Sequence, residues 1–219
     1  MKDIVKENYA KILQEIEGKD VTVLPVVKGR SSADFDALRA VGLMTVGENR
    51  AQEFMRHYDE QQGKGYKWHF IGQLQSNKVK YVLGKCDLIH SLDRISLARE
   101  IDRLSGQRGL ITECLIEVNV GDEGSKGGLP PCQDVIEDFI RDIGEFKNIK
   151  IRGIMAVMPY LDSDEEIEPY YEKLAELYGS LKDRYNFDIL SAGMSDDYKI
   201  AVKYGANLIR LGRVLFESR

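Results

Sequence analysis

Cysteine is scarce in this sequence, and long apolar segments are absent. Only Cys86, Cys114 and Cys132 occur among the 219 residues, too few and too scattered for a disulfide framework. No CxxC pair or Cys/His cluster has the spacing of a zinc site, so we expect no bound metal. No segment is long enough to cross a bilayer, and the N-terminus lacks the apolar core of a signal peptide. We therefore expect reduced thiols, a cytoplasmic location and no membrane partner.

A surplus of positive charge is also lacking. The chain has 31 basic and 36 acidic side chains, which gives a net charge of -5. This balance leaves no electrostatic footprint for nucleic acid or for an anionic membrane, so a local site must hold any anionic ligand. No linker or low-complexity tract divides the sequence, and we expect one domain over residues 1–219.

Strand-like apolar segments alternate with helical patterns along the chain. The expected strands are residues 21–28, 44–49, 68–72, 87–91, 112–120, 150–157, 189–193 and 207–211. A helix over residues 3–17 precedes them. This alternation predicts a parallel sheet, and the number of strands favours an α/β fold, a closed (β/α)8 TIM barrel with an extra N-terminal helix. Pro25 is an irregular feature, because proline removes one donor from the ladder.

The first expected strand ends at Lys28, which is followed at once by Gly29. In parallel barrels the chemistry gathers at the C-terminal ends of the strands. A lysine shielded there by the barrel walls and near other cations would have its ammonium form disfavoured, which leaves free amine to attack an aldehyde. The alternative is an ordinary lysine with its head in water. Asn49 follows the second strand at the same rim.

Two loops near the end of the chain have the features of an anion site. Residues 193–197 join the seventh strand to a helix, so Ser195, next to Met194, stands where a helix N-terminus offers free donors. Gly212 and Arg213 follow the eighth strand and allow the backbone to approach the same anion. Barrels often build a phosphate site from these two loops. The alternative for Ser195 is a simple helix cap.

Closure of the barrel would place the first strand beside the eighth, and therefore Lys28 beside this phosphate cradle. A lysine amine next to a phosphate site indicates a phosphorylated aldehyde bound as a Schiff base, and the commonest such cofactor is pyridoxal 5'-phosphate. Arg210 points from the eighth strand toward the same mouth. There it would face the pyridine nitrogen and keep it unprotonated, because arginine accepts no proton. The alternative for Arg210 is a structural ion pair.

Several short motifs also run in a fixed order along the chain. They are Gly47-Glu48-Asn49 with Gln52-Glu53, Trp68-His69-Phe70-Ile71-Gly72 with Leu74-Gln75 and Asn77-Lys78, His90-Ser91 with Asp93-Arg94, Asn119-Val120 with Gly121, Glu123, Ser125-Lys126 and Gly128, Arg152-Gly153-Ile154-Met155-Ala156, Gly193-Met194-Ser195-Asp196-Asp197 and Arg210-Leu211-Gly212. Together they resemble the pyridoxal phosphate homeostasis protein family, single-domain relatives of the alanine racemase N-terminal barrel. The resemblance covers nearly the whole chain.

The resemblance implies a role for each part of the rim. Lys28 would carry pyridoxal 5'-phosphate as an internal aldimine, Ser195 and the backbone of Gly212 and Arg213 would hold the phosphate, and Asn49 would lie near the ring. The implied function is intracellular pyridoxal phosphate homeostasis and amino-acid balance, without established catalytic turnover. Transient contact with client apo-enzymes would accompany it. We expect a monomer.

The chain departs from the family pattern at the site itself. The family usually has serine before the cofactor lysine and threonine after it, where this chain has Val27 and Gly29. It usually has threonine after the glycine of the last strand, where this chain has Arg213. We expect the Arg213 guanidinium to replace the missing hydroxyl with a charge-assisted phosphate contact.

Two other functions remain open at this stage. A pyridoxal phosphate-dependent amino-acid racemase needs acid/base groups on both faces of the substrate carbon, and only Tyr160 or Tyr198 offers a second group here. A lysine aldolase on the same barrel would bind a sugar phosphate instead. His69 is expected to be a satisfied core histidine, and Glu48 is either a buried acid near the ring or the partner of an arginine.

Overall fold

The strands form one closed parallel sheet. The structure, a computed structural model, describes residues 2–121, 127–161 and 163–218. Its strands are β1 (Thr22–Pro25), β2 (Thr45–Glu48), β3 (Lys67–Phe70), β4 (Leu88–Leu92), β5 (Thr112–Val118), β6 (Ile149–Ala156), β7 (Ile189–Ser191) and β8 (Leu208–Leu211). The eight-stranded sheet has the order β1-β8-β7-β6-β5-β4-β3-β2. The expected parallel barrel is confirmed.

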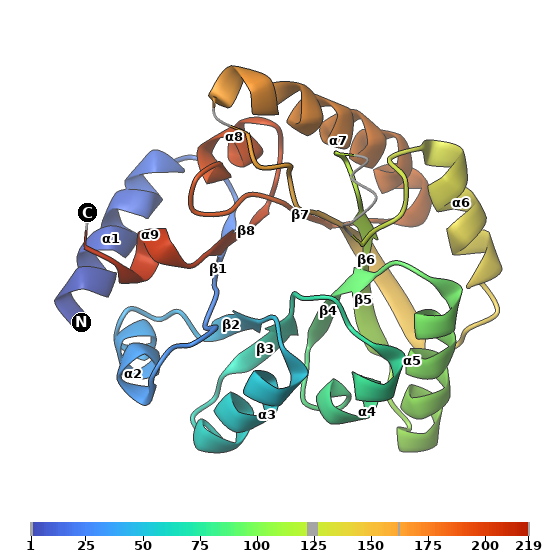
Figure 1. The fold of residues 1–219 in the computed structure, drawn as a ribbon, viewed down its shortest axis with the longest axis horizontal. Helices are drawn as coiled ribbons and strands as arrows, with labels where there is room; N and C mark the ends of the chain where they lie inside the picture. The colour runs from blue at the N-terminus through green and yellow to red at the C-terminus, as the bar shows by residue number, and fades with distance from the viewer. Residues whose placement is uncertain (1, 122–126, 162, 219) are drawn as a thin grey trace.

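Helices surround this ring of strands (Figure 1). They are α1 (Lys2–Glu15), α2 (Ser32–Ala40), α3 (Ala51–Glu60), the 3-10 turn η1 (Ser76–Lys78), α4 (Val79–Val82), α5 (Ile95–Arg108), α6 (Gln133–Asp142), α7 (Asp164–Tyr185), α8 (Tyr198–Lys203) and α9 (Arg213–Phe216). The extra helix α1 lies where the sequence predicted it, before β1. In Figure 1 the first and last helices, α1 and α9, lie side by side.

The barrel closes where β1 pairs with β2, and Pro25 explains why this pairing is short. Val26 donates its N–H to Leu211 of β8 at 2.8 Å, while the next residue, Val27, donates to Gly47 of β2 at 2.9 Å. Because donors alternate along a strand, the nitrogen of Pro25 faces β2 and has no hydrogen to give. A single bridge between Val26 and Gly47 therefore joins β1 to β2.

The core lies between the strands and the surrounding helices. Trp68 of β3 packs against Phe54 of α3 with ring centroids 5.5 Å apart, and both side chains are buried. On the other side of the barrel, the long helix α7 buries Tyr171, Leu174 and Leu181. Burial on both faces explains why the strands read as continuous apolar runs in the sequence.

The predicted elements differ from the observed ones mainly at the rim. β1 stops at Pro25, before Lys28, because residues 27–30 turn sharply. α8 begins at Tyr198 and not at Ser195, because the Asp197 carboxylate accepts the N–H of Met194 at 2.5 Å and holds the preceding residues in a turn.

Within the described ranges, no helix combines the length and the apolar character that a bilayer span requires.

Candidate functional site

Lys28 lies in a tight turn directly after β1. The carbonyl oxygen of Val27 accepts the N–H of Arg30 at 3.0 Å, so Lys28 and Gly29 are the central residues of a β-turn. Gly29 has a φ of 68° whereas Lys28 keeps a negative φ, which is the pattern of a type II turn. The Lys28 side chain is exposed, so the expected shielding by the barrel walls is not observed.

The turn explains why glycine follows the lysine in this chain. A Cβ at Gly29 would meet no atom within 4 Å, so a Gly29→Ala substitution adds only backbone strain. We expect it to lower the free energy of unfolding by about 1 kcal/mol. The helical Gly179 of α7, which also has open space around it, is the matched control. Gly179→Ala should raise stability by roughly 0.5–1 kcal/mol in the same urea titrations. Equal effects of both substitutions would contradict the turn assignment.

Lys28 and Asn49 line one pocket at this rim. The pocket has a volume of about 460 Å³, and its lining consists of Lys28, Gly29, Asn49, Arg50 and Glu53. Oδ1 of Asn49 is buried and accepts no hydrogen bond from any described residue. A buried acceptor without a partner costs free energy, so a ligand donor placed there would be stabilised.

The loop after β7 is held in place by Asp197. One carboxylate oxygen of Asp197 accepts the Met194 N–H, and the other accepts the Tyr171 hydroxyl at 2.8 Å. Gly193 is required beside it, because φ is 93° and an added Cβ would lie 2.6 Å from Cβ of Ala201. Met194 itself is 39% exposed. These contacts hold the loop and thus position the following residue, Ser195.

Ser195 connects this loop to the one after β8. Its Oγ accepts the N–H of Val214 at 3.2 Å. Among the described residues, the N–H groups of Ser195, Gly212 and Arg213 donate to no protein acceptor. The Arg213 guanidinium forms an exposed ion pair with Asp196. The backbone, more than the arginine side chain, therefore offers free donors between the two loops.

Strand register brings the Lys28 turn next to these donors. β1 and β8 run parallel, with Pro25 opposite Leu211. One residue further on, Val26 and Gly212 are close enough that a Cβ on Gly212 would lie 3.8 Å from Cβ of Val26. The amine-bearing turn and the free backbone donors thus share one rim of the barrel, as the sequence predicted.

Arg210 lies inside the barrel below this rim. Its side chain is buried, and Nη1 donates to the carbonyl oxygen and to Oγ of Ser191, both at 2.8 Å. Nη2 donates to the carbonyl oxygen of Ala156 at 2.8 Å. The recorded partners are thus carbonyl and hydroxyl oxygens, and the structural ion pair considered above does not form with any described carboxylate. Burial lowers the pKa of Arg210 from its ordinary value.

A polar chain runs from Arg210 across the barrel. Ser191 Oγ lies 3.1 Å from Nδ1 of His90, whose Nε2 lies 3.0 Å from Nδ1 of His69. Since arginine can only donate, Ser191 Oγ accepts from Arg210 and donates its own hydroxyl hydrogen bond to Nδ1 of His90. Nε2 of His90 then donates a hydrogen bond to His69. Burial lowers the pKa of His69 to about 4 and that of His90 well below its ordinary value. Both rings are therefore neutral at pH 7, and His69 is a hydrogen-bonded histidine of the barrel interior.

Glu117 is a titratable group at the barrel mouth that the sequence reading missed. It lies near the end of β5, is 7% exposed, and accepts the side-chain N–H of Gln73 at 2.6 Å. Burial and the carboxylate of Asp93 raise the pKa of Glu117 to about 7, against the opposing charge of Arg210. The only sequence signal was an acidic residue inside an apolar strand.

The two tyrosines considered for a racemase differ in position. Tyr198 is buried and donates its hydroxyl to Glu15 of α1, an outer helix. Tyr160 is 88% exposed and lines a pocket together with Asp196 and Arg213. Tyr160 is thus the one that lies beside the loops of the rim.

Comparison with known proteins decides the family. A family model described as "Alanine racemase, N-terminal domain" matches residues 2–219. A pyridoxal phosphate homeostasis protein of Aquifex aeolicus is 41% identical over 215 residues, which cover 97% of this chain and 89% of that protein. The chain belongs to the pyridoxal phosphate homeostasis protein family.

Solved structures agree with the family and with the fold. PipY of Synechococcus elongatus PCC7942, solved with PLP bound, has a TM-score of 0.86 and 27% identity, over 97% of this chain and 100% of PipY. An alanine racemase of Clostridium difficile 630 has a TM-score of 0.78 and 16% identity, over 99% of this chain and 57% of the racemase. The second likeness shows the fold alone, and it confirms the expected alanine racemase-like barrel.

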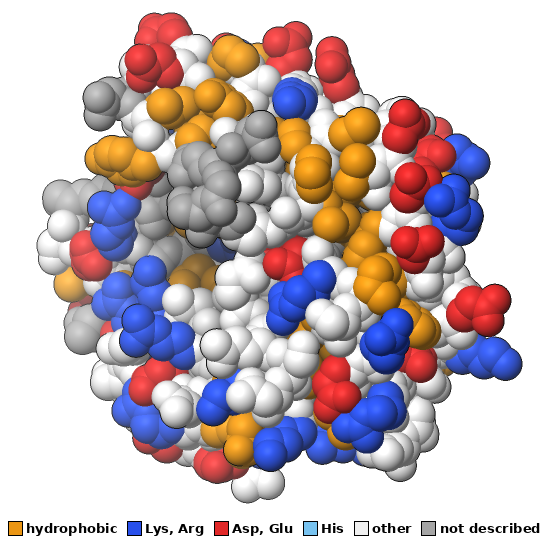
Figure 2. Space-filling view, turned by 45° about the vertical axis from the view of Figure 1, so that its right-hand side comes forward, with side chains coloured by type: hydrophobic (Ala, Val, Ile, Leu, Met, Phe, Trp, Pro, Cys, Tyr) orange, Lys and Arg blue, Asp and Glu red, His pale blue; other side chains and the backbone are white. Residues whose placement is uncertain are grey.

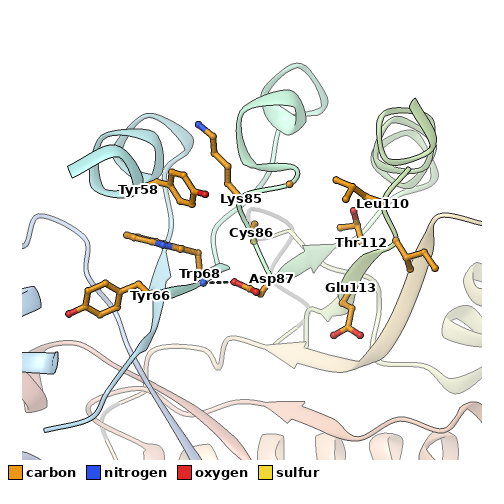
Figure 3. A pocket seen from close by; sticks show the side chains of 11 residues that line it. Tyr58, Tyr66, Trp68, Lys85, Cys86, Asp87, Leu110, Thr112 and Glu113 are labelled. Carbon is orange, nitrogen blue, oxygen red and sulfur yellow. Dashed lines mark hydrogen bonds between the residues drawn. The ribbon is translucent and has the colours of Figure 1, made fainter. Parts of the chain in front are cut away.

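A second pocket lies at the opposite end of this family member's barrel, where β3, β4 and β5 begin. Figure 3 shows its aromatic wall of Tyr58, Tyr66 and Trp68. Its acidic groups already have partners, because Asp87 accepts the backbone N–H of Trp68 and Glu113 pairs with Lys150 and Arg152. The rim with Lys28 is therefore the better candidate, since Oδ1 of Asn49 is buried there without a described partner and parallel barrels carry chemistry at that end.

Charge on the surface is mixed. On the face shown in Figure 2, Lys and Arg side chains are interspersed with Asp and Glu side chains. The net charge of -5 and the mixed charge of this face give it no broad positive field for a polyanion.

Proposed function

We propose that this chain binds pyridoxal 5'-phosphate as a Schiff base on Lys28 and serves in pyridoxal phosphate homeostasis. The relatives support the proposal: the Aquifex aeolicus protein carries that function in its name, and PipY was solved with PLP bound. The observation that carries it is the adjacency of an exposed lysine and free backbone donors on one rim. A single domain acting as a monomer remains part of the proposal.

Lys28 supplies the nucleophile. When bound, pyridoxal phosphate supplies an aldehyde that reacts reversibly with amines. The amine of Lys28 would be the group that adds to this aldehyde, with water as the leaving group. Because the Lys28 turn is exposed, the reverse hydrolysis needs no opening of the barrel. Reversible attachment at an accessible rim is what a cofactor carrier requires.

The remaining rim residues fit the other groups of the ligand. The free N–H groups of Ser195, Gly212 and Arg213 suit a phosphate, which accepts several hydrogen bonds at once. Asn49 lies beside Lys28 with an unpartnered Oδ1, and the buried Arg210 lies below the same rim. In this proposal the Arg213 guanidinium reaches the phosphate by giving up its surface ion pair with Asp196, a pair that costs little to break.

Reduction with borohydride tests the proposal directly. The purified protein is mixed with pyridoxal 5'-phosphate, reduced, digested and mapped by peptide mass. We expect one phosphopyridoxyl group, attached to the peptide that contains Lys28. A protein that gains no visible absorbance with the cofactor, or a label spread evenly over surface lysines, would overturn the proposal.

A further inference from the structure

A buried glutamate and a buried histidine lie behind the Lys28 pocket. Glu48 is the last residue of β2, and His57 lies in the last turn of α3. Both side chains are 0% exposed, and Oε2 of Glu48 lies 3.0 Å from Nδ1 of His57. Since carboxylate oxygens only accept, Nδ1 of His57 carries a hydrogen and donates it. The glutamate whose partner the sequence left open is thus bound to a histidine.

The other oxygen of Glu48 holds one wall of the pocket. Oε1 accepts the backbone N–H of Asn49 at 2.7 Å and that of Arg50 at 3.3 Å. These residues stand between the end of β2 and the start of α3 and supply part of the pocket lining. The carboxylate therefore fixes the backbone from which the Asn49 side chain reaches the rim.

The other nitrogen of His57 holds the opposite wall. Nε2 lies 3.1 Å from the carbonyl oxygen of Arg30, the residue that closes the turn around Lys28. Nε2 also lies 3.0 Å from Nη2 of Arg56, which pairs with Glu53. Because Nδ1 already donates its hydrogen to Glu48, Nε2 donates to Arg30 only when the ring is doubly protonated, and it accepts from Arg56 when the ring is neutral. In the first state His57 ties the Lys28 turn to Glu48.

We propose that Glu48 and His57 are positioning residues that set the distance between Lys28 and Asn49. The inference rests on the proposed function, because it concerns the same site. One side-chain pair contacts the backbone of both segments that supply Lys28, Gly29, Asn49 and Arg50 to the pocket. Attack on an aldehyde held by the rest of the rim requires the amine within a narrow range of positions. A loosened turn would slow attachment even in a folded protein.

Two substitutions of His57 separate this role from a merely structural one. In His57→Asn the amide nitrogen can still donate to Glu48, but it cannot reach the carbonyl of Arg30. In His57→Gln the longer amide loses the contact with Glu48 but can still donate to Arg30, so α3 still anchors the Lys28 turn. We expect His57→Asn to slow covalent attachment of pyridoxal phosphate at least about tenfold, and His57→Gln to stay within about threefold of the unmodified protein. The rate is followed by the rise of visible absorbance after mixing.

A buried pair at the other end of the barrel provides the control. Oγ of Ser105 lies 2.7 Å from Oγ1 of Thr112 at the start of β5, and both residues are buried. Ser105→Ala should lower the melting temperature without changing the attachment rate. Equal rates for the two His57 variants, the reverse order, or a slow Ser105→Ala variant would overturn the inference. A label on Lys28 in the unmodified protein keeps the proposed function intact in each of these cases, whereas its absence would overturn both.

Discussion

Replacing Lys28 by arginine is expected to abolish covalent attachment of pyridoxal phosphate while leaving the fold intact. The guanidinium stays protonated at any accessible pH, so it offers no free amine to the aldehyde. Lys28 is exposed and forms no ion pair with a described residue, so stability should change by less than about 0.5 kcal/mol. Intact mass after borohydride reduction measures the attachment, and urea unfolding measures the stability.

Lys78→Arg is the matched control for this experiment. Lys78 lines the neighbouring pocket, which shares Asn49 and Arg50 with the Lys28 pocket. If any lysine at the barrel mouth could react, both variants would lose part of the covalent attachment. If Lys28 is the specific site, only Lys28→Arg loses it. If Lys28→Arg still gained one phosphopyridoxyl group, another lysine would be the attachment site and the proposed role of Lys28 would be wrong.

The barrel could be predicted because burial on both faces gives parallel strands a plain signature. Each strand reads as an apolar run, and each helix as a 3.6-residue period, so the eight units were visible. The rim could not be predicted to the residue. Lys28 falls beyond β1 because Gly29 allows a type II turn, and α8 begins late because Asp197 binds the Met194 N–H. A backbone dihedral angle determines the first boundary and a side-chain hydrogen bond the second, and hydrophobic periodicity indicates neither of them.

The candidate site was predicted only where one short segment carries its own signal. A lysine at a strand end and Gly212 directly after the last strand are such signals, and the register of β1 and β8 brought them together. His57 carries none, because its burial depends on packing against Phe35, whose ring centroid lies 5.3 Å away, and on a partner in another element. Pairs formed by tertiary contact in this way leave no local pattern in one sequence.

Two glutamates of β5 show the same limit. Glu113 and Glu117 are four residues apart, so the alternation of a strand gives them the same side of the sheet. Glu113 lies at the start of β5, where Lys150 and Arg152 pair with it, and Glu117 lies at the buried mouth. The sequence offers no way to tell them apart, yet the pKa of Glu113 is lowered and the pKa of Glu117 is raised.

Replacing Glu117 by glutamine is expected to remove a pH dependence of stability. Burial first, and then the charge of Asp93, raise the pKa of Glu117 from 4.5 to about 7. Between these values the folded protein binds more protons than the unfolded chain, so the free energy of unfolding falls as the pH rises through this window. The full loss amounts to about 3 kcal/mol above pH 7. Glu117→Gln should therefore be more stable than the unmodified protein at pH 8, and nearly equal to it at pH 4.

Glu113→Gln on the same strand should show the opposite sign. Burial acts to raise the pKa of Glu113, but the hydrogen bonds from Lys150 and Arg152 outweigh it and lower that pKa. The ionised carboxylate therefore stabilises the fold at neutral pH, and this stability is lost as the pH falls through the lowered pKa. Urea unfolding of both variants from pH 4 to pH 8 measures the two differences against the unmodified protein. Glu117→Gln could instead lose stability at pH 8, as Glu113→Gln is expected to do. Partners at the mouth would then stabilise the Glu117 carboxylate, and the conclusion that burial destabilises its ionised form would be wrong.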